Sequence, residues 1–255
     1  MKLADKLGLL AAPEGPQIHV VNGMRIELDH SILTHRLMFY DLYEENVMNF
    51  LKGYLKPGMT VFDPGANLGY FAAKCLGWIR PGGRVISFEP SHTCLDRLKL
   101  NADLEDWELH PIALTDHVGE MTFYDTPRVI SRGYACLEGV ADPKDRIEHP
   151  VHVTTIDRFC EEKKIGRIDF LKLDIERSEL PALKGAQRMI AEHAIPVILI
   201  ETTLLTDSDR EAVTRMDLLL RNAGYSSFQV ERNGRLRPID VLTRRSLRED
   251  IIWKL

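Results

Sequence analysis

Several features that define whole classes of proteins are missing from this sequence. It has no run of about eighteen apolar residues that could span a membrane, and its start lacks the basic segment and apolar core of a signal peptide. It also has no low-complexity tract and no evident internal repeat. We therefore expect a cytoplasmic protein that does not bind a membrane.

Cysteine pairs and clustered positive charge are absent too. The four cysteines lie far apart and form no C-x-x-C pair, so they suggest neither a zinc site nor a disulfide framework, and we expect free thiols: Cys75, Cys94, Cys136 and Cys160. Lysines and arginines are dispersed, and the formal net charge is −5. Because nucleic-acid-binding proteins usually carry a basic surface, we expect no nucleic-acid partner. Nothing in the sequence indicates an oligomeric state.

The chain does have enough apolar sequence for one large core. Of its 255 residues, 44% are apolar and 28% are charged, and no linker interrupts them, so we expect 1–255 to form a single domain. From about residue 58, strand-like runs alternate with helical segments, which is typical of a doubly wound, mostly parallel α/β sheet. The predicted strands, seven in all, are 60–63, 84–89, 107–112, 168–174, 195–201, 225–231 and 250–254. The predicted helices lie near 67–78, 91–102, 178–192 and 208–223, and Ser178 is the expected cap of the third.

Two segments fall outside this alternation. Residues 113–157 contain no clear helix, but 121–124 and 151–154 alternate like strands. We expect them to form a β-rich insertion near the ligand site. Residues 1–50 are separate from the core, and we predict a hairpin about Asn22-Gly23 in a lid position.

The most informative segment places a short apolar run, a carboxylate and two glycines in succession. It reads Thr60-Val-Phe-Asp-Pro-Gly-Ala-Asn-Leu-Gly-Tyr-Phe-Ala-Ala73 and predicts a strand, a tight turn and a helix. Such a turn lies at the carboxyl edge of a parallel sheet, where open α/β folds bind ligands. A second apolar run, 84–88, ends in Glu89, which is well placed to accept hydrogen bonds from ribose hydroxyls.

Two classes of cofactor use this arrangement. A nicotinamide or flavin dinucleotide normally requires the fuller G-x-G-x-x-G turn, but this turn offers only Gly65 and Gly69. The negative charge of Asp63 would repel a pyrophosphate and suit an ammonium or sulfonium group, both of which S-adenosylmethionine carries. The sequence therefore favours S-adenosylmethionine, and a dinucleotide-dependent oxidoreductase remains the enzyme alternative.

Seven motifs, taken in order, make the chain resemble the FkbM-type S-adenosylmethionine-dependent methyltransferases. They are Asp63-Pro-Gly-Ala-Asn-Leu-Gly-Tyr70, Phe88-Glu-Pro90, Ala113-Leu-Thr-Asp116, Thr155-Ile-Asp157, Phe170-Leu-Lys-Leu-Asp-Ile-Glu176, Leu183-Lys-Gly-Ala186 and Glu201. The resemblance runs from about Tyr43 to the C-terminus, and Tyr43-Glu44 matches a Tyr-Glu pair common in the family. Two departures are Pro64, where the family more often has valine, and Arg177, where it usually has glycine.

This resemblance implies a Rossmann-like class I methyltransferase fold. It also implies O-methylation of a hydroxyl on a sugar, glycan, polyketide or related secondary metabolite, so the expected partner is a small-molecule or glycan acceptor. A non-catalytic nucleotide-binding module is the alternative from another class, with Arg177 as the sign of a decayed catalytic edge. The retention of four carboxylates argues against this alternative: Asp63, Glu89, Asp174 and Glu201.

Carboxylates are predicted to gather at the carboxyl edge of the sheet, where a base could take the acceptor's proton. The candidate catalytic residues are Asp174, Glu176 and Glu201, with Asp174 first. We expect Glu179 to lie at a solvated helix start. The candidate cofactor-binding residues are Glu44, Asp63, Gly65, Ala66, Asn67, Gly69, Tyr70, Glu89, Pro90, Ser91, Ala113 and Asp174.

Other polar residues carry weaker indications. Asp174 and Glu201 could coordinate Mg²⁺, but nothing in their spacing demands a metal, and we do not favour one. Strand alternation does not put His149 and His152 on one face, and His110 is expected to be structural or to border an adenine pocket. Three arginines of the insertion could meet a phosphate or carboxylate of the acceptor, although exposed arginines are more often solvated: Arg128, Arg132 and Arg146.

Overall fold

A central sheet of eight strands organises the molecule, which is represented by a computed structural model that describes residues 15–105, 107–125, 147–204, 206–244 and 247–255. The strand order is β12-β11-β13-β10-β9-β3-β4-β5. The parallel strands are β3 (Thr60–Pro64), β4 (Arg84–Phe88), β5 (Glu108–His110), β9 (Phe170–Leu173) and β10 (Val197–Leu204). The antiparallel strands are β11 (Ser226–Val230), β12 (Leu236–Pro238) and β13 (Leu247–Lys254). The predicted doubly wound, mostly parallel sheet is confirmed, and β12 adds a short eighth strand.

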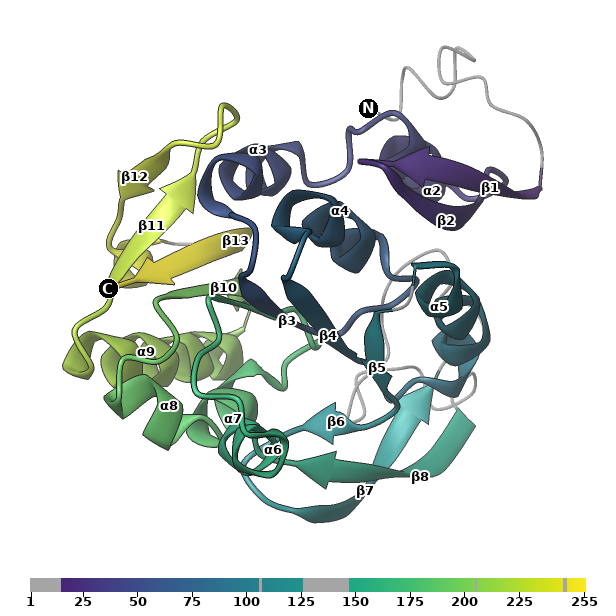
Figure 1. The fold of residues 1–255 in the computed structure, drawn as a ribbon. Helices are drawn as coiled ribbons and strands as arrows, with labels where there is room; N and C mark the ends of the chain where they lie inside the picture. Colours follow the sequence, from purple (N-terminus) through teal and green to yellow (C-terminus); the bar gives the residue numbers. More distant parts are fainter. Residues whose placement is uncertain (1–14, 106, 126–146, 205, 245–246) are drawn as a thin grey trace.

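Helices cover both faces of this sheet (Figure 1). On one face lie α3 (Glu45–Tyr54), α4 (Tyr70–Ile79) and α5 (His92–Glu105), and on the other lie α6 (Ile156–Lys163), α7 (Glu179–Lys184), α8 (Gln187–Ala191) and α9 (Asp207–Asn222). Successive strand residues point to opposite faces, and β3 shows the result: Val61 packs into one apolar cluster and Phe62 into the other. Both side chains are fully buried. No helix among the described residues is long and apolar enough to cross a membrane.

The order of the strands places a ligand site beside β3. The chain continues from β3 to β4 and β5 on one side, and later adds β9 and β10 on the other side. In open α/β sheets the crevice at such a reversal, outside the carboxyl ends of the strands, is where ligands bind. The turn after β3 and the residues after β9 meet at this point.

The insertion forms a separate three-stranded sheet below the β5 edge (Figure 1), in the order β6-β8-β7. Its strands are β6 (Ala113–Leu114), β7 (Gly119–Asp125) and β8 (Ile147–Thr154), which contain both predicted strand segments. Helix α6 follows at once and was not predicted. Thr155 caps it by accepting a hydrogen bond from the backbone N–H of Arg158.

The predicted helix 178–192 is two helices. Ser178 makes no side-chain cap, and α7 ends at Lys184. The Asp157 carboxylate accepts hydrogen bonds from the backbone N–H groups of Arg188 (2.7 Å) and Met189 (3.0 Å). It thereby caps the start of α8, and the chain turns between the two helices at Gly185-Ala186.

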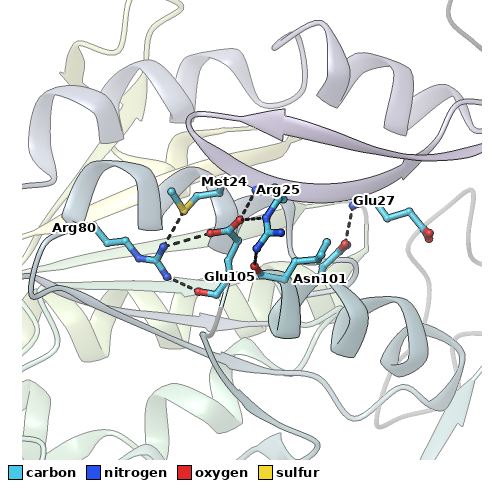
Figure 2. Close-up of polar contacts among 7 residues, drawn as sticks. Met24, Arg25, Glu27, Arg80, Asn101 and Glu105 are labelled. Carbon is cyan, nitrogen blue, oxygen red and sulfur yellow. Dashed lines mark hydrogen bonds and ion pairs between the residues drawn. The ribbon is translucent and has the colours of Figure 1, made fainter.

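The N-terminal hairpin forms as predicted, from β1 (Pro16–Val21) and β2 (Met24–Asp29), with Asn22 and Gly23 both at positive φ. Helix α2 (Leu33–Phe39) and helix α3 follow it, and neither was predicted. Figure 2 shows how β2 is fastened to the core: the Glu105 carboxylate receives hydrogen bonds from Arg25 and Arg80. The hairpin is therefore docked against α5 by several polar contacts.

Candidate active site

A cavity of about 420 Å³ opens at the carboxyl edge of β3, β4, β9 and β10. Helix α2 supplies part of one wall through Thr34, His35 and Met38, and the insertion contributes Phe123. Eleven of the predicted site residues line the cavity: Glu44, Gly65, Ala66, Asn67, Tyr70, Glu89, Pro90, Ala113, Asp174, Glu176 and Glu201. Residues widely separated in the sequence are thus brought to one place.

Three other predicted cofactor residues do not line the cavity. Asp63 is completely buried, and burial raises the pKa of its carboxyl to about 7 although Lys172 lowers it. Gly69 shapes the turn: it has a φ of +89°, and a Cβ there would lie 2.6 Å from the Trp107 ring. Ser91 is also completely buried, and it contacts Glu89 instead of the cavity. These three residues therefore lie behind the cavity wall and do not form it.

The turn after β3 passes very close to the end of β9. Gly65 has a φ of +77°, and a Cβ there would lie 1.9 Å from the backbone oxygen of Asp174. Only glycine fits both the backbone angle and the space. Asn101, a buried residue of α5, fixes the same turn from the other side: its Nδ2 donates to the oxygen of Leu68 (2.7 Å), and its Oδ1 accepts from the N–H of Glu27 in the hairpin (2.7 Å; Figure 2).

Glu89 presents a carboxylate that two backbone groups orient. Its Oε2 accepts from the N–H of Asn67 (2.8 Å), and its Oε1 accepts from the N–H of Ser91 (2.9 Å). Burial raises the pKa of this carboxyl to about 7, while the two N–H groups oppose the shift. Since each carboxylate oxygen has two lone pairs, Glu89 can accept further hydrogen bonds from the cavity side. This geometry fits the vicinal hydroxyls of a ribose.

The predicted acidic edge is present in the structure. Asp174, Glu176 and Glu201 each place one oxygen within 4.8 Å of the others. A metal ion could use such a group, but acidic groups cluster without one as well, and the preference against a metal stays a prediction.

Arg177 stands where the FkbM-type sequences that this chain resembles usually have glycine. The backbone conformation of Arg177 explains the preference for glycine at this position. Its φ is +73°, in the left-handed region that glycine adopts without strain. The Arg177 guanidinium forms an ion pair with the Asp209 carboxylate at 3.3 Å, at the start of α9. The turn therefore keeps a glycine-like conformation with an arginine in it.

Glu179 is not at a solvated helix start, so that prediction is wrong. Its side chain is buried, and its Oε1 accepts from the backbone N–H groups of Ile175 (3.1 Å) and Arg177 (3.3 Å). Burial raises the pKa of its carboxyl to about 8. The side chain closes the turn between β9 and α7.

Sequence reasoning missed two charged residues of the cavity. Lys172 is buried, and its Nζ lies 2.8 Å from Asp174 Oδ2 and 5.2 Å from the centre of the Phe71 ring. Burial lowers the pKa of Lys172, but the nearby carboxylates outweigh burial and raise it overall. Asp250 lies opposite Glu201 in the β10–β13 register. Its pKa is raised, mainly by burial and in addition by the neighbouring carboxylates.

None of the three histidines considered from the sequence lines the cavity. His110 does not line the cavity; its Nε2 lies 2.8 Å from Glu108 and its ring stacks on Phe88. His149 packs against His92, whereas His152 is exposed beside Glu120, which confirms that the two do not share a face. The expectation for Arg128, Arg132 and Arg146 falls outside the described residues.

Comparisons with known proteins agree with this fold. The sequence profile of the methyltransferase FkbM domain matches residues 63–227, which is more than half of the chain. The fold is that of the class I methyltransferases, as in the crystal structure of methyltransferase FkbM from Methylobacillus flagellatus, with a TM-score of 0.52 and 19% identity over 87% of this chain and 54% of that one. The chain belongs to the FkbM methyltransferase family.

Two curated relatives are similar in sequence. The 31-O-demethyl-FK506 methyltransferase FkbM of Streptomyces tacrolimicus is 27% identical over 215 residues, 72% of this chain and 78% of the relative. The hexuronic acid methyltransferase AglP of Haloferax volcanii is 25% identical over 146 residues, 56% of each chain. This chain therefore spans only about half the length of AglP and of the solved structure.

Proposed function

We propose that this protein is an S-adenosylmethionine-dependent O-methyltransferase that acts on a hydroxyl of a sugar, a glycan, a polyketide or a similar secondary metabolite. One observation carries the proposal: the oriented Glu89 carboxylate and the acidic edge of Asp174, Glu176 and Glu201 line the same cavity. Membership of a methyltransferase family supports methyl transfer. The names of the two curated relatives, a 31-O-demethyl-FK506 methyltransferase and a hexuronic acid methyltransferase, support the acceptor class.

The cofactor would lie along the turn after β3. Glu89 would accept hydrogen bonds from the ribose hydroxyls, and Pro90 and Ala113 would border the adenine. The acidic residue Glu44, which lines the cavity, would suit the methionine ammonium. Bound S-adenosylmethionine supplies a methyl group already activated by the sulfonium charge.

The chain must then orient the acceptor and receive its proton. Lys172 pairs with Asp174 Oδ2, which leaves Oδ1 to accept from the acceptor hydroxyl. The carboxylate would receive the proton of the hydroxyl as the hydroxyl oxygen bonds to the methyl carbon, and the carbon–sulfur bond of the bound cofactor would break to leave S-adenosylhomocysteine. Glu176 and Glu201 lie close enough to share this role.

The two alternatives from the sequence lose support. A dinucleotide-dependent oxidoreductase is set aside because the chain belongs to a methyltransferase family. A decayed, non-catalytic module rested on Arg177, but that residue takes the glycine-like backbone angle and gains an ion pair with Asp209. The acidic edge stays intact beside it.

A transfer assay tests the proposal directly. The protein is incubated with S-adenosylmethionine carrying a trideuterated methyl group and with panels of glycosides and polyketide alcohols. We expect a product heavier by one labelled methyl group, with NMR placing that group on oxygen. Transfer only to nitrogen or carbon acceptors would contradict O-methylation, and no transfer to any acceptor class would contradict the proposed acceptors.

A further inference from the structure

One buried carboxylate of the insertion contacts the segment between β4 and α5, beside the cavity. Asp125 ends β7 and is 1% exposed. Its Oδ1 accepts hydrogen bonds from the hydroxyls of Ser91 (2.6 Å) and Thr93 (3.1 Å), and its Oδ2 accepts from the N–H of Thr93 (3.3 Å). His149 Nε2 lies 3.7 Å from the same Oδ2. Asp125 therefore fixes the segment between β4 and α5 from a different sheet.

Ser91 joins this carboxylate to a second one. Its backbone N–H donates to Glu89 Oε1, while its side-chain hydroxyl donates to Asp125. The residue is completely buried and does not line the cavity. Ser91 therefore links the two carboxylates: Asp125 holds its hydroxyl, and its backbone N–H donates to Glu89.

Glu89 depends on such positioning. Its carboxylate is buried, so each N–H that points at it contributes both orientation and stabilisation of the charged form. If the Ser91 N–H moves, Oε1 can turn away from the direction in which a ribose would meet it. A displacement of Glu89 Oε1 by about a few tenths of an ångström would change the length and angle of its hydrogen bonds to the ribose and so weaken them.

We infer that Asp125 is a positioning residue for the cofactor: through Ser91 it holds Glu89 in the geometry that receives the ribose hydroxyls. The inference rests on the proposed function, because it takes the ligand of Glu89 to be the ribose of S-adenosylmethionine. It gives the β-rich insertion a part in cofactor recognition. Asp125 also stabilises the start of α5 as a carboxylate at a helix N-terminus, and a role in helix stability alone would leave ribose recognition untouched.

A comparison of two ligands separates these roles. Ser91→Ala keeps the backbone N–H but removes the hydroxyl that Asp125 holds, and Asp125→Asn is the second variant in case the first does not fold. Each is titrated by calorimetry with S-adenosylhomocysteine and with its 2′,3′-dideoxy analogue, which lacks the ribose hydroxyls. We expect about 5- to 30-fold weaker binding of S-adenosylhomocysteine, the size of one displaced hydrogen bond to a charged group, and less than about 2-fold change for the analogue.

Matched controls come from α9 and β11, outside the cavity. Asp217 is also 1% exposed and accepts hydrogen bonds from Arg221 and Trp253, and Ser227 is buried with its hydroxyl donating to Ile239. Asp217→Asn and Ser227→Ala should leave both affinities unchanged. Equal weakening for the two ligands, or no weakening in folded variants, would overturn the inference. Failure of the parent protein to bind S-adenosylhomocysteine would overturn the proposed function itself, and this inference with it.

Discussion

The ammonium of Lys172 lies 2.8 Å from Oδ2 of Asp174, two residues further along the chain. Lys172 lies in β9 and Asp174 directly follows the end of this strand, and both residues line the cavity. The carboxylates of Glu44 and Asp63 also act on Lys172. The single charge of Lys172 therefore compensates the carboxylates of Asp174, Glu44 and Asp63 together.

Removal of this cation should be costly. In Lys172→Met the neighbouring carboxylates lose their buried partner, and we expect the free energy of unfolding at pH 7 to fall by about 3–5 kcal/mol in urea titrations. Arg215→Met breaks an exposed ion pair with Glu211 and should cost less than about 1 kcal/mol. A cost for Lys172→Met as small as that of the control would show that Lys172 does not stabilise the edge.

Glu89 should govern affinity for the cofactor. Glu89→Ala removes the acceptor of the ribose hydroxyls, and we expect S-adenosylhomocysteine binding to weaken by about 1–3 kcal/mol in calorimetric titrations. Glu162→Ala, at an exposed position of α6, is the control for loss of a carboxylate. Unchanged affinity in a folded Glu89→Ala protein would refute the assignment.

Replacement of Asp174 should lower turnover much more than it lowers cofactor affinity. If Asp174 accepts the proton of the acceptor, Asp174→Asn should lower turnover by roughly 10²–10⁴-fold at saturating cofactor, with far less change in S-adenosylhomocysteine affinity. Turnover equal to that of the parent would transfer the role to Glu176 or Glu201. With Lys172 as the cation of the site, we expect a chelator to leave the turnover of the parent protein unchanged. If a chelator abolishes turnover and Mg²⁺ restores it, a metal is required.

Glu179 should make stability depend on pH. Burial raises the pKa of its carboxyl from 4.5 to about 8, so the folded protein keeps a proton that the unfolded chain releases. The resulting stabilisation is complete below about pH 4 and is lost as the pH rises through about 8. Glu179→Gln keeps the oxygen acceptor but cannot ionise, so its unfolding free energy relative to the parent should rise by about 2–4 kcal/mol between pH 5 and 8. Glu162→Gln should show no such trend, and a flat difference for Glu179→Gln would refute the assignment.

Local patterns allowed much of the fold and the part of the cavity wall around Gly65 and Glu89 to be predicted. The turn from Gly65 to Gly69 and the carboxylate of Glu89 each come directly after an apolar run that predicts a strand. Their positions depend on strand ends and backbone angles, which neighbouring residues determine. The Asn22-Gly23 hairpin was predicted for the same reason.

Features set by distant parts of the chain were missed. Asp250 reaches the acidic edge because β13 runs antiparallel, so the beginning of this strand lies beside the end of β10. The break between α7 and α8 depends on Asp157, which comes thirty-one residues before Arg188. Lys172 sits within a buried run, where the sequence gives no sign that carboxylates from other elements will surround it.

The central claim is that the cavity binds S-adenosylmethionine, and calorimetry of the purified protein tests it most directly. Separate titrations with S-adenosylmethionine, S-adenosylhomocysteine and the nicotinamide dinucleotides compare the cofactor classes under the same conditions. We predict saturable binding of the first two at one molecule per chain and no binding of the dinucleotides. Binding of a dinucleotide, or of neither S-adenosyl compound, would contradict the account.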